Sequence, residues 1–202
     1  AILGLPTGNT PTGMYEELVR KHREEGLDFS RVTTFNLDDY VGLTPDHPAS
    51  FAAYIKTNLL NHVNIDAANA HWPEAVGDAE AACVAYEEAI RRAGGLGLVI
   101  LGIGTNGHIA FNEPGTSFAT RTHVARLADN TRHIAAAGGS FASLDEVPEY
   151  GITMGIETIT AAQQVVLLAS GASKADAVAA AVTGPVTEDM PASVLQRHPH
   201  AT

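Results

Sequence analysis

The chain has 202 residues, of which 45% are hydrophobic and 17% charged, enough for one sizeable domain with a packed core. Its formal net charge of −11 argues against binding to nucleic acid or to an anionic membrane surface, because both attract Lys and Arg. A single cysteine, Cys83, excludes an intrachain disulfide, and no apolar run reaches membrane-spanning length or resembles a signal peptide. We therefore expect a cytoplasmic protein with a single domain over 1–202. Because the chain starts at Ala1 inside an apolar run, we also expect that terminal elements are missing.

Short apolar runs are followed by Gly-rich loops and helical stretches at three places. Continuous apolar runs of this kind are typical of strands buried on both faces of a parallel sheet. Thr10 is expected to cap the first helix and Gly26 to end it. The alternation predicts an α/β sandwich. The predicted elements are a strand at 1–5, a helix at 11–25, a strand at 31–36 running on to 40, helices at 49–62 and 78–93, strands at 96–102 and 164–169, and a helix that ends at 182.

The loops that follow the predicted strands carry most of the unusual residues. In an open α/β sheet, the loops at the carboxyl ends of the strands gather along one edge, where ligands bind. We therefore expect one cleft to be formed by the loops 5–10, 36–42, 102–115 and 170–174.

Two of these loops suggest a phosphate site. Thr7, Gly8, Asn9 and Thr10 lie between a strand and a helix, where free N–H groups and the helix dipole favour an anion. Lys174 stands at the first turn of another helix, where a cation opposes the dipole unless an anion is bound. The alternatives are an ordinary turn and cap for the first loop and a solvated lysine for the second, but the coincidence of the two loops favours phosphate.

Asp38 and Asp39 stand at the end of a predicted strand, so their side chains should point to opposite faces. A carboxylate that faces the cleft could remove a proton from a carbon next to a carbonyl, with its pKa raised by burial or by the neighbouring charge. The alternative is a pair of capping acids in a turn, and the residues alone favour that alternative.

The segment 101–115 contains glycines 102, 104 and 107 in the G-x-G-x-x-G spacing of dinucleotide sites, and Asp129 follows at a suitable distance. However, Pro114 comes too early for the long helix that such a site needs. We therefore rank the dinucleotide interpretation lower.

The same segment brings His108, Glu113 and Asn106 into one short loop. A histidine held by a carboxylate can transfer protons at neutral pH. The alternative is a structural histidine. The other histidines are scattered, apart from His198 and His200, and none has the spacing of a metal site. We expect no metal and no cofactor.

Four segments carry distinctive motifs: 3–11 (LGLPTGNTP), 34–43 (TFNLDDYVGL), 104–114 (GTNGHIAFNEP) and 170–174 (SGASK). With these motifs the chain resembles the glucosamine-6-phosphate deaminase (isomerase) family along nearly its whole length. The resemblance implies a three-layer, modified Rossmann-like α/β sandwich with a mostly parallel sheet. It also implies the conversion of glucosamine 6-phosphate and water to fructose 6-phosphate and ammonia, a hydrolytic deamination in amino-sugar catabolism.

The resemblance also implies roles for the candidate residues. His108 would open the sugar ring with support from Asn106 and Glu113. Asp38 would move a proton from C2 to C1, after which the imine is hydrolysed. The substrate phosphate would be held by Thr7, Gly8, Asn9, Thr10 and Lys174.

Two departures from the family pattern stand out. Asn106 replaces an aspartate found in some members, so Glu113 is the only acid beside His108. The stretch 133–139, which corresponds to a flexible lid, lacks the arginine that often meets the substrate phosphate. A 6-phosphogluconolactonase-like hydrolase and a non-catalytic sugar-phosphate sensor remain alternatives. The expected partner is a small amino-sugar phosphate, and association into a homo-oligomer stays open.

Overall fold

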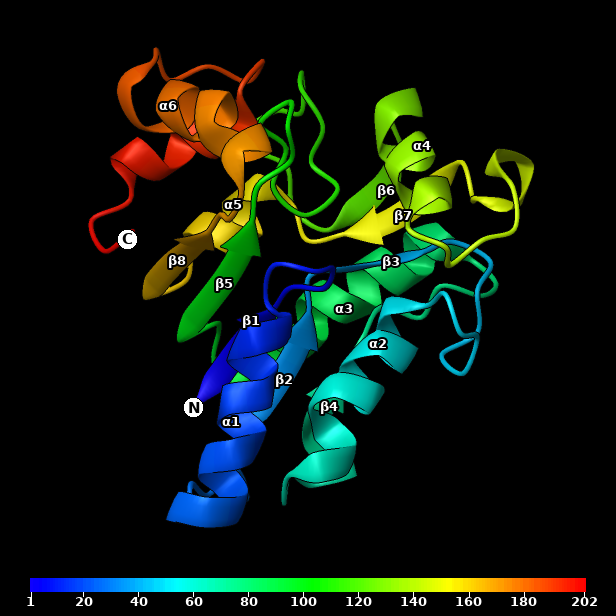
Figure 1. Ribbon diagram of the computed structural model, residues 1–202, viewed down its shortest axis with the longest axis vertical. Coiled ribbons are helices and arrows are strands. Elements are labelled where there is room, and N and C mark those ends of the chain that lie inside the picture. Colours follow the sequence, from blue (N-terminus) through cyan, green and yellow to red (C-terminus); the bar gives the residue numbers. More distant parts are fainter.

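The computed structural model describes residues 1–202 and contains a five-stranded parallel sheet and a separate three-stranded antiparallel sheet (Figure 1). The parallel sheet has the strand order β4-β2-β1-β5-β8, and it confirms the predicted α/β class. Its strands are β1 (Ile2–Leu5), β2 (Thr33–Asn36), β4 (Ala70–His71), β5 (Leu98–Gly102) and β8 (Gln164–Leu168).

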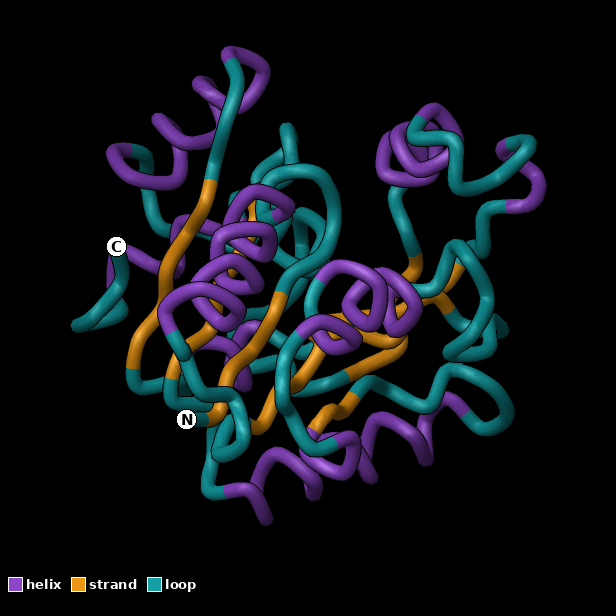
Figure 2. The backbone as a smooth tube through the Cα atoms, turned by 60° about the horizontal axis from the view of Figure 1, so that its bottom comes forward, coloured by secondary structure: helices purple, strands orange, loops and turns teal.

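Helices cover both faces of the parallel sheet, because successive side chains of a strand point to opposite sides. On β5, Ile100 packs with α1 and α2 on one face, whereas Val99 and Leu101 pack with α3, α5 and α6 on the other. Figures 1 and 2 show the resulting layers. No helix combines the length and the apolar composition needed to cross a membrane. The helices are α1 (Thr12–Glu25), α2 (Phe51–Asn58), α3 (Ala79–Ala93), α4 (Asp129–Ala137), α5 (Ile156–Thr160) and α6 (Ala175–Thr183), with 3-10 turns at Leu60–His62, Ala67–Asn69, Leu144–Glu146, Ala172–Lys174 and Pro191–Arg197.

The antiparallel sheet was not predicted from the sequence. It consists of β3 (Asp38–Tyr40), β7 (Tyr150–Thr153) and β6 (His123–Arg126), with β7 in the middle. The expectation of one strand running from 31 to 40 is therefore wrong. The chain leaves the first sheet at Leu37, whose N–H donates to Leu5 O and whose carbonyl accepts from Met154 N at 2.7 Å, so that Leu37 joins the two sheets.

The predicted boundaries of α1 are confirmed to within one residue, but the predicted N-cap is not. Gly26 ends the helix with a left-handed φ of 73°, as expected for a C-terminal glycine. At the other end the cap position is occupied by Pro11, and no side chain caps the helix. The expected cap at Thr10 is therefore wrong, because Thr10 belongs to the preceding loop.

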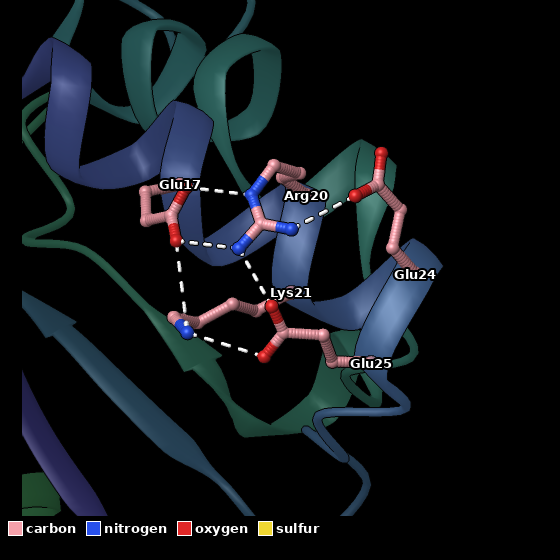
Figure 3. Close-up of polar contacts among 5 residues, drawn as sticks. All are labelled: Glu17, Arg20, Lys21, Glu24 and Glu25. Atoms are coloured by element: carbon pink, nitrogen blue, oxygen red, sulfur yellow. Dashed lines mark hydrogen bonds and ion pairs between the residues drawn. The ribbon is translucent and has the colours of Figure 1, made fainter.

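The exposed face of α1 carries a network of ion pairs (Figure 3). Arg20 contacts the carboxylates of Glu17, Glu24 and Glu25 at 2.7–2.8 Å, and Lys21 lies 3.2 Å from Glu25. Such exposed pairs add little stability, since solvent screens them. The network neutralises both cations, so this helix face is no basic patch.

Asp39 is nearly fully buried at 1% exposure and caps the start of α2. One oxygen accepts from the N–H groups of Tyr40 and Phe51 at 2.8 and 2.9 Å, and the other accepts from Ala52 N at 3.0 Å. These three bonds offset part of the cost of burying the carboxylate, although burial still raises the pKa of Asp39, and the bonds from Phe51 and Ala52 tie α2 to β3.

We expect Asp39→Ala to lower the free energy of unfolding by about 3 kcal/mol or more, because three buried N–H groups lose their acceptor. Urea denaturation followed by circular dichroism measures the change. The matched control is Asp46→Ala, which removes an exposed ion pair with Lys56 and should change stability by no more than about 0.5 kcal/mol. Equal stability of the two variants would contradict the capping role.

Candidate active site

A cleft of about 550 Å³ lies at the carboxyl ends of the parallel strands. The loops that follow β1, β2, β5 and β8 all contribute to it, which confirms the expected meeting of these segments. Among the residues that line the cleft, Lys174 is the only Lys or Arg, and Asp38 is the only carboxylic acid. The predicted site residues that line it are Thr7, Gly8, Asn9, Thr10, Asp38, His108 and Lys174.

Asp38 and Asp39 point to opposite sides of β3, as the alternation of a strand requires. Asp39 faces α2, while Asp38 lines the cleft and is 6% exposed. Burial and the neighbouring charge of Asp39 raise the pKa of Asp38 well above its ordinary value, and no hydrogen bond offsets this shift. A carboxyl group with a raised pKa can accept a proton and return it more readily than an exposed one.

His108 lies in the cleft, with Glu113 and Asn106 behind it. Nδ1 of His108 is 3.3 Å from Oε2 of Glu113, although the contact is bent away from hydrogen-bond geometry. The side-chain amide of Asn106 donates to the same Glu113 oxygen at 2.8 Å, and its carbonyl oxygen accepts from the His108 backbone N–H at 3.2 Å. Asn106 and Glu113 therefore do not line the cleft but hold the residue that does.

The second oxygen of Glu113 faces the start of α4. It accepts from the Thr131 hydroxyl at 2.5 Å and from Ala128 N at 3.3 Å, and α4 has no capping side chain of its own. Burial raises the pKa of Glu113, but His108, Thr131 and Asn106 outweigh burial and hold that pKa at about 2. Glu113 is thus an ionised carboxylate shared between His108 and a helix N-terminus.

The first Gly-rich loop presents free donors to the cleft. None of the backbone N–H groups of Thr7, Gly8, Asn9 and Thr10 donates to an acceptor in the chain. Lys174 forms no ion pair, and burial lowers its pKa. Clustered N–H groups and an uncompensated ammonium together favour a bound anion.

The wall of the cleft that α4 contributes carries no positive charge. Ile134, Ala135 and Gly138 line the cleft from this side, and Ile134 is 53% exposed. The guanidinium of Arg132 points elsewhere and donates to the carbonyls of Leu144 and Val147. Arg132 therefore does not replace the arginine that the 133–139 stretch lacks.

No group of three or more His, Cys, Asp or Glu side chains is arranged to hold a metal ion. His198 has both ring nitrogens engaged, since Nε2 contacts Ala162 O at 2.9 Å and Nδ1 accepts from His200 N. The ring of His198 therefore serves the fold.

Sequence reasoning missed several polar residues of the cleft, and two of them contact predicted site residues. Thr131 contacts Glu113, and the hydroxyl of Tyr54 contacts the carbonyl of Gly8. Neither residue lies in a motif or in a strand-end loop. Their helical positions gave no signal, because only the tertiary structure brings them to the site.

Comparisons with known proteins place the chain in one family. The family described as glucosamine-6-phosphate isomerases/6-phosphogluconolactonase matches residues 1–202. The chain is 50% identical to a glucosamine-6-phosphate deaminase of Arthrobacter sp. (strain FB24), covering 100% of this chain and 77% of that protein. It is 48% identical to glucosamine-6-phosphate deaminase 2 of Bacillus subtilis (strain 168), covering 100% and 82%.

Solved structures give the same picture. A monomeric glucosamine-6-phosphate deaminase superposes with a TM-score of 0.97 at 44% identity, covering 100% of this chain and 83% of that one. The 6-phosphogluconolactonase of Thermotoga maritima, at 22% identity and a TM-score of 0.74, shares the fold. The chain belongs to the family of glucosamine-6-phosphate isomerases and 6-phosphogluconolactonases.

Proposed function

We propose that this chain is a glucosamine-6-phosphate deaminase, which converts glucosamine 6-phosphate and water to fructose 6-phosphate and ammonia. The observation that carries the proposal is the pairing of a buried, uncompensated Asp38 with an anion-binding loop in one cleft. Relatives about half identical to this chain, and covered over most of their length, bear the name of that enzyme.

In this proposal the 6-phosphate binds the N–H groups of residues 7–10 and the ammonium of Lys174. Fixing the phosphate at one end of the cleft places the sugar carbons between Asp38 and His108, and such positioning removes much of the entropic barrier. The single cation is sufficient because four free N–H groups share the anionic charge.

His108 then opens the sugar ring by moving a proton between the ring oxygen and the C1 hydroxyl. Glu113 keeps the ring of His108 in place, while Asn106 orients both groups. Asp38 removes the C2 proton and returns it to C1, while a proton of the amino group passes to the C1 oxygen, which leaves an alcohol at C1 and a protonated imine at C2. Hydrolysis of that imine releases ammonia, so the overall reaction is a hydrolytic deamination.

The family description also includes a lactonase, which would cleave the ester of a sugar-acid phosphate with water. That reaction needs a base for water but no transfer of a proton between carbons. Incubating the protein with each substrate distinguishes the two, with ammonia and fructose 6-phosphate as products of one and acid release as the product of the other.

We expect Asp38→Asn to reduce turnover of glucosamine 6-phosphate by about 10²–10⁴-fold, because a positioned base contributes this much. Substrate binding should persist, since the phosphate loop is unchanged. Coupled ammonia detection measures the rate and calorimetry measures binding, with Asp46→Asn as an exposed control. Full activity of Asp38→Asn would exclude the mechanism.

The rate should also depend on pH through Asp38. The base must be ionised, and burial together with Asp39 raises its pKa above the ordinary 3.8. The value of kcat/KM should therefore fall on acidification with a midpoint above 3.8. Asp39→Asn removes the neighbouring charge, so the midpoint should move to lower pH. A shift to higher pH would contradict the electrostatic coupling.

Gly104 makes room for the catalytic ring. A Cβ atom at this position would collide with the imidazole of His108. We expect Gly104→Ala to displace the ring from Glu113 and to reduce turnover by about 10²-fold, as misplaced catalytic groups do. The pKa of Glu113 should rise from about 2 toward its ordinary value, because His108 lowers it. NMR titration of the carboxyl carbon measures this shift.

The control for this experiment is Gly13→Ala in α1, where a Cβ atom would meet nothing within 4 Å. This variant should keep both the activity and the low pKa of Glu113. An unchanged pKa in Gly104→Ala would show that the ring had not moved.

A further inference from the structure

Two tyrosines hold the first Gly-rich loop by its carbonyl groups. The hydroxyl of Tyr15, on α1, donates to the carbonyl of Pro6 at 2.6 Å, and the hydroxyl of Tyr54, on α2, donates to the carbonyl of Gly8 at 2.6 Å. The two rings pack edge to face, with centroids 6.3 Å apart. Two helices therefore fix the direction of two carbonyl groups in one short loop.

The direction of these carbonyls matters for an anion. A carbonyl oxygen carries a partial negative charge, so an anion site needs N–H groups turned inward and C=O groups turned outward. Gly8 has a φ of 87°, which a side chain at this position would disfavour. With its carbonyl bound by Tyr54, the Gly8 peptide cannot rotate without losing a hydrogen bond.

Tyr54 and Tyr15 differ in their location: Tyr15 lies in the interior and Tyr54 at the cleft. Tyr15 is fully buried and its hydrogen bond lies in the interior, whereas Tyr54 borders the cleft. The ring of Tyr54 packs on Tyr15, so phenylalanine would preserve that packing. Thr12, the first residue of α1, supports the same contact, with its Oγ1 3.2 Å from Tyr54 Oη and 3.4 Å from Gly8 O.

We propose that Tyr54 is a positioning residue for the substrate phosphate: its hydroxyl holds the Gly8 carbonyl away from the anion and thereby sets the affinity of the loop. The proposal rests on the proposed function, because it assigns the loop to the phosphate of the sugar. Tyr54 does not touch the reacting carbons in this scheme. Its effect should therefore be equal in the ground state and in the transition state, which changes KM and leaves kcat unchanged.

The test is Tyr54→Phe in the full chain. We expect KM for glucosamine 6-phosphate to rise about three- to tenfold, the usual effect of losing one such hydrogen bond. The constant kcat should stay within about twofold. The inhibition constant of inorganic phosphate should rise by the same factor as KM. The matched control is Tyr150→Phe, at an exposed tyrosine of β7 remote from the loop, which should change none of these constants.

A second variant keeps the test independent of one substitution. Thr12→Val leaves the ring of Tyr54 in place and removes the weaker hydroxyl contact, so it should raise KM by a smaller factor. A fall in kcat with unchanged KM in Tyr54→Phe would overturn the proposal. The proposal would also be overturned if Tyr54→Phe raised KM no more than Tyr150→Phe does, or if it left the affinity for inorganic phosphate unchanged.

The failure of the proposed function can be recognised separately. If the unaltered protein produces no ammonia from glucosamine 6-phosphate, the proposed function fails. Calorimetric binding of inorganic phosphate to the unaltered protein and to Tyr54→Phe then still measures the role of Tyr54. Equal phosphate affinity in both proteins would reject that role whatever the reaction is.

Discussion

Two adjacent carboxyl groups are buried where the two sheets meet, and hydrogen bonds stabilise only one of them. Burial raises the pKa of both, but three N–H groups offset part of this shift at Asp39, whereas the charge of Asp39 adds to the shift at Asp38. A buried charge without partners is costly, so the two side chains cannot exchange roles. The arrangement requires a strand at this point, because only strand geometry sends neighbouring residues to opposite sides. Because of this strand, Asp39 holds the start of α2 and Asp38 faces the cleft as the candidate base.

The connection between the two sheets at Leu37 explains why β3 could not be predicted as a separate strand. The run from residue 31 to 40 reads as one strand, since its pattern is continuous. Leu37 divides it because Leu5 and Met154, far away in the chain, bind its N–H and its carbonyl. The partner strands β6 and β7 have four residues each, too few for a local pattern to indicate them. Short strands depend on long-range pairing, which a single sequence does not display.

The candidate site was more accessible to sequence reasoning than the second sheet. Strand ends in a parallel sheet converge by geometry, so the meeting of the four loops could be derived from the order of elements. The sequence also placed Asn106 and Glu113 near His108. It could not show that these two side chains lie outside the cleft and hold His108, because that depends on the directions of the side chains. Tyr54 and Thr131 lie within helices, and nothing in their local pattern distinguishes them from ordinary helical residues. Their contribution arises only when helices are packed against loops.

Glu113 serves two structures at once, His108 on one side and the start of α4 on the other. A proton and a helix therefore compete for the same carboxylate. Thermodynamic linkage makes this competition reciprocal. An interaction that strengthens the contact between α4 and Glu113 weakens proton binding to Glu113. Protonation of Glu113 weakens the contact with α4 by the same free energy. The protonation state of Glu113 and the stability of the contact that holds α4 are thus coupled, so a change in one changes the other.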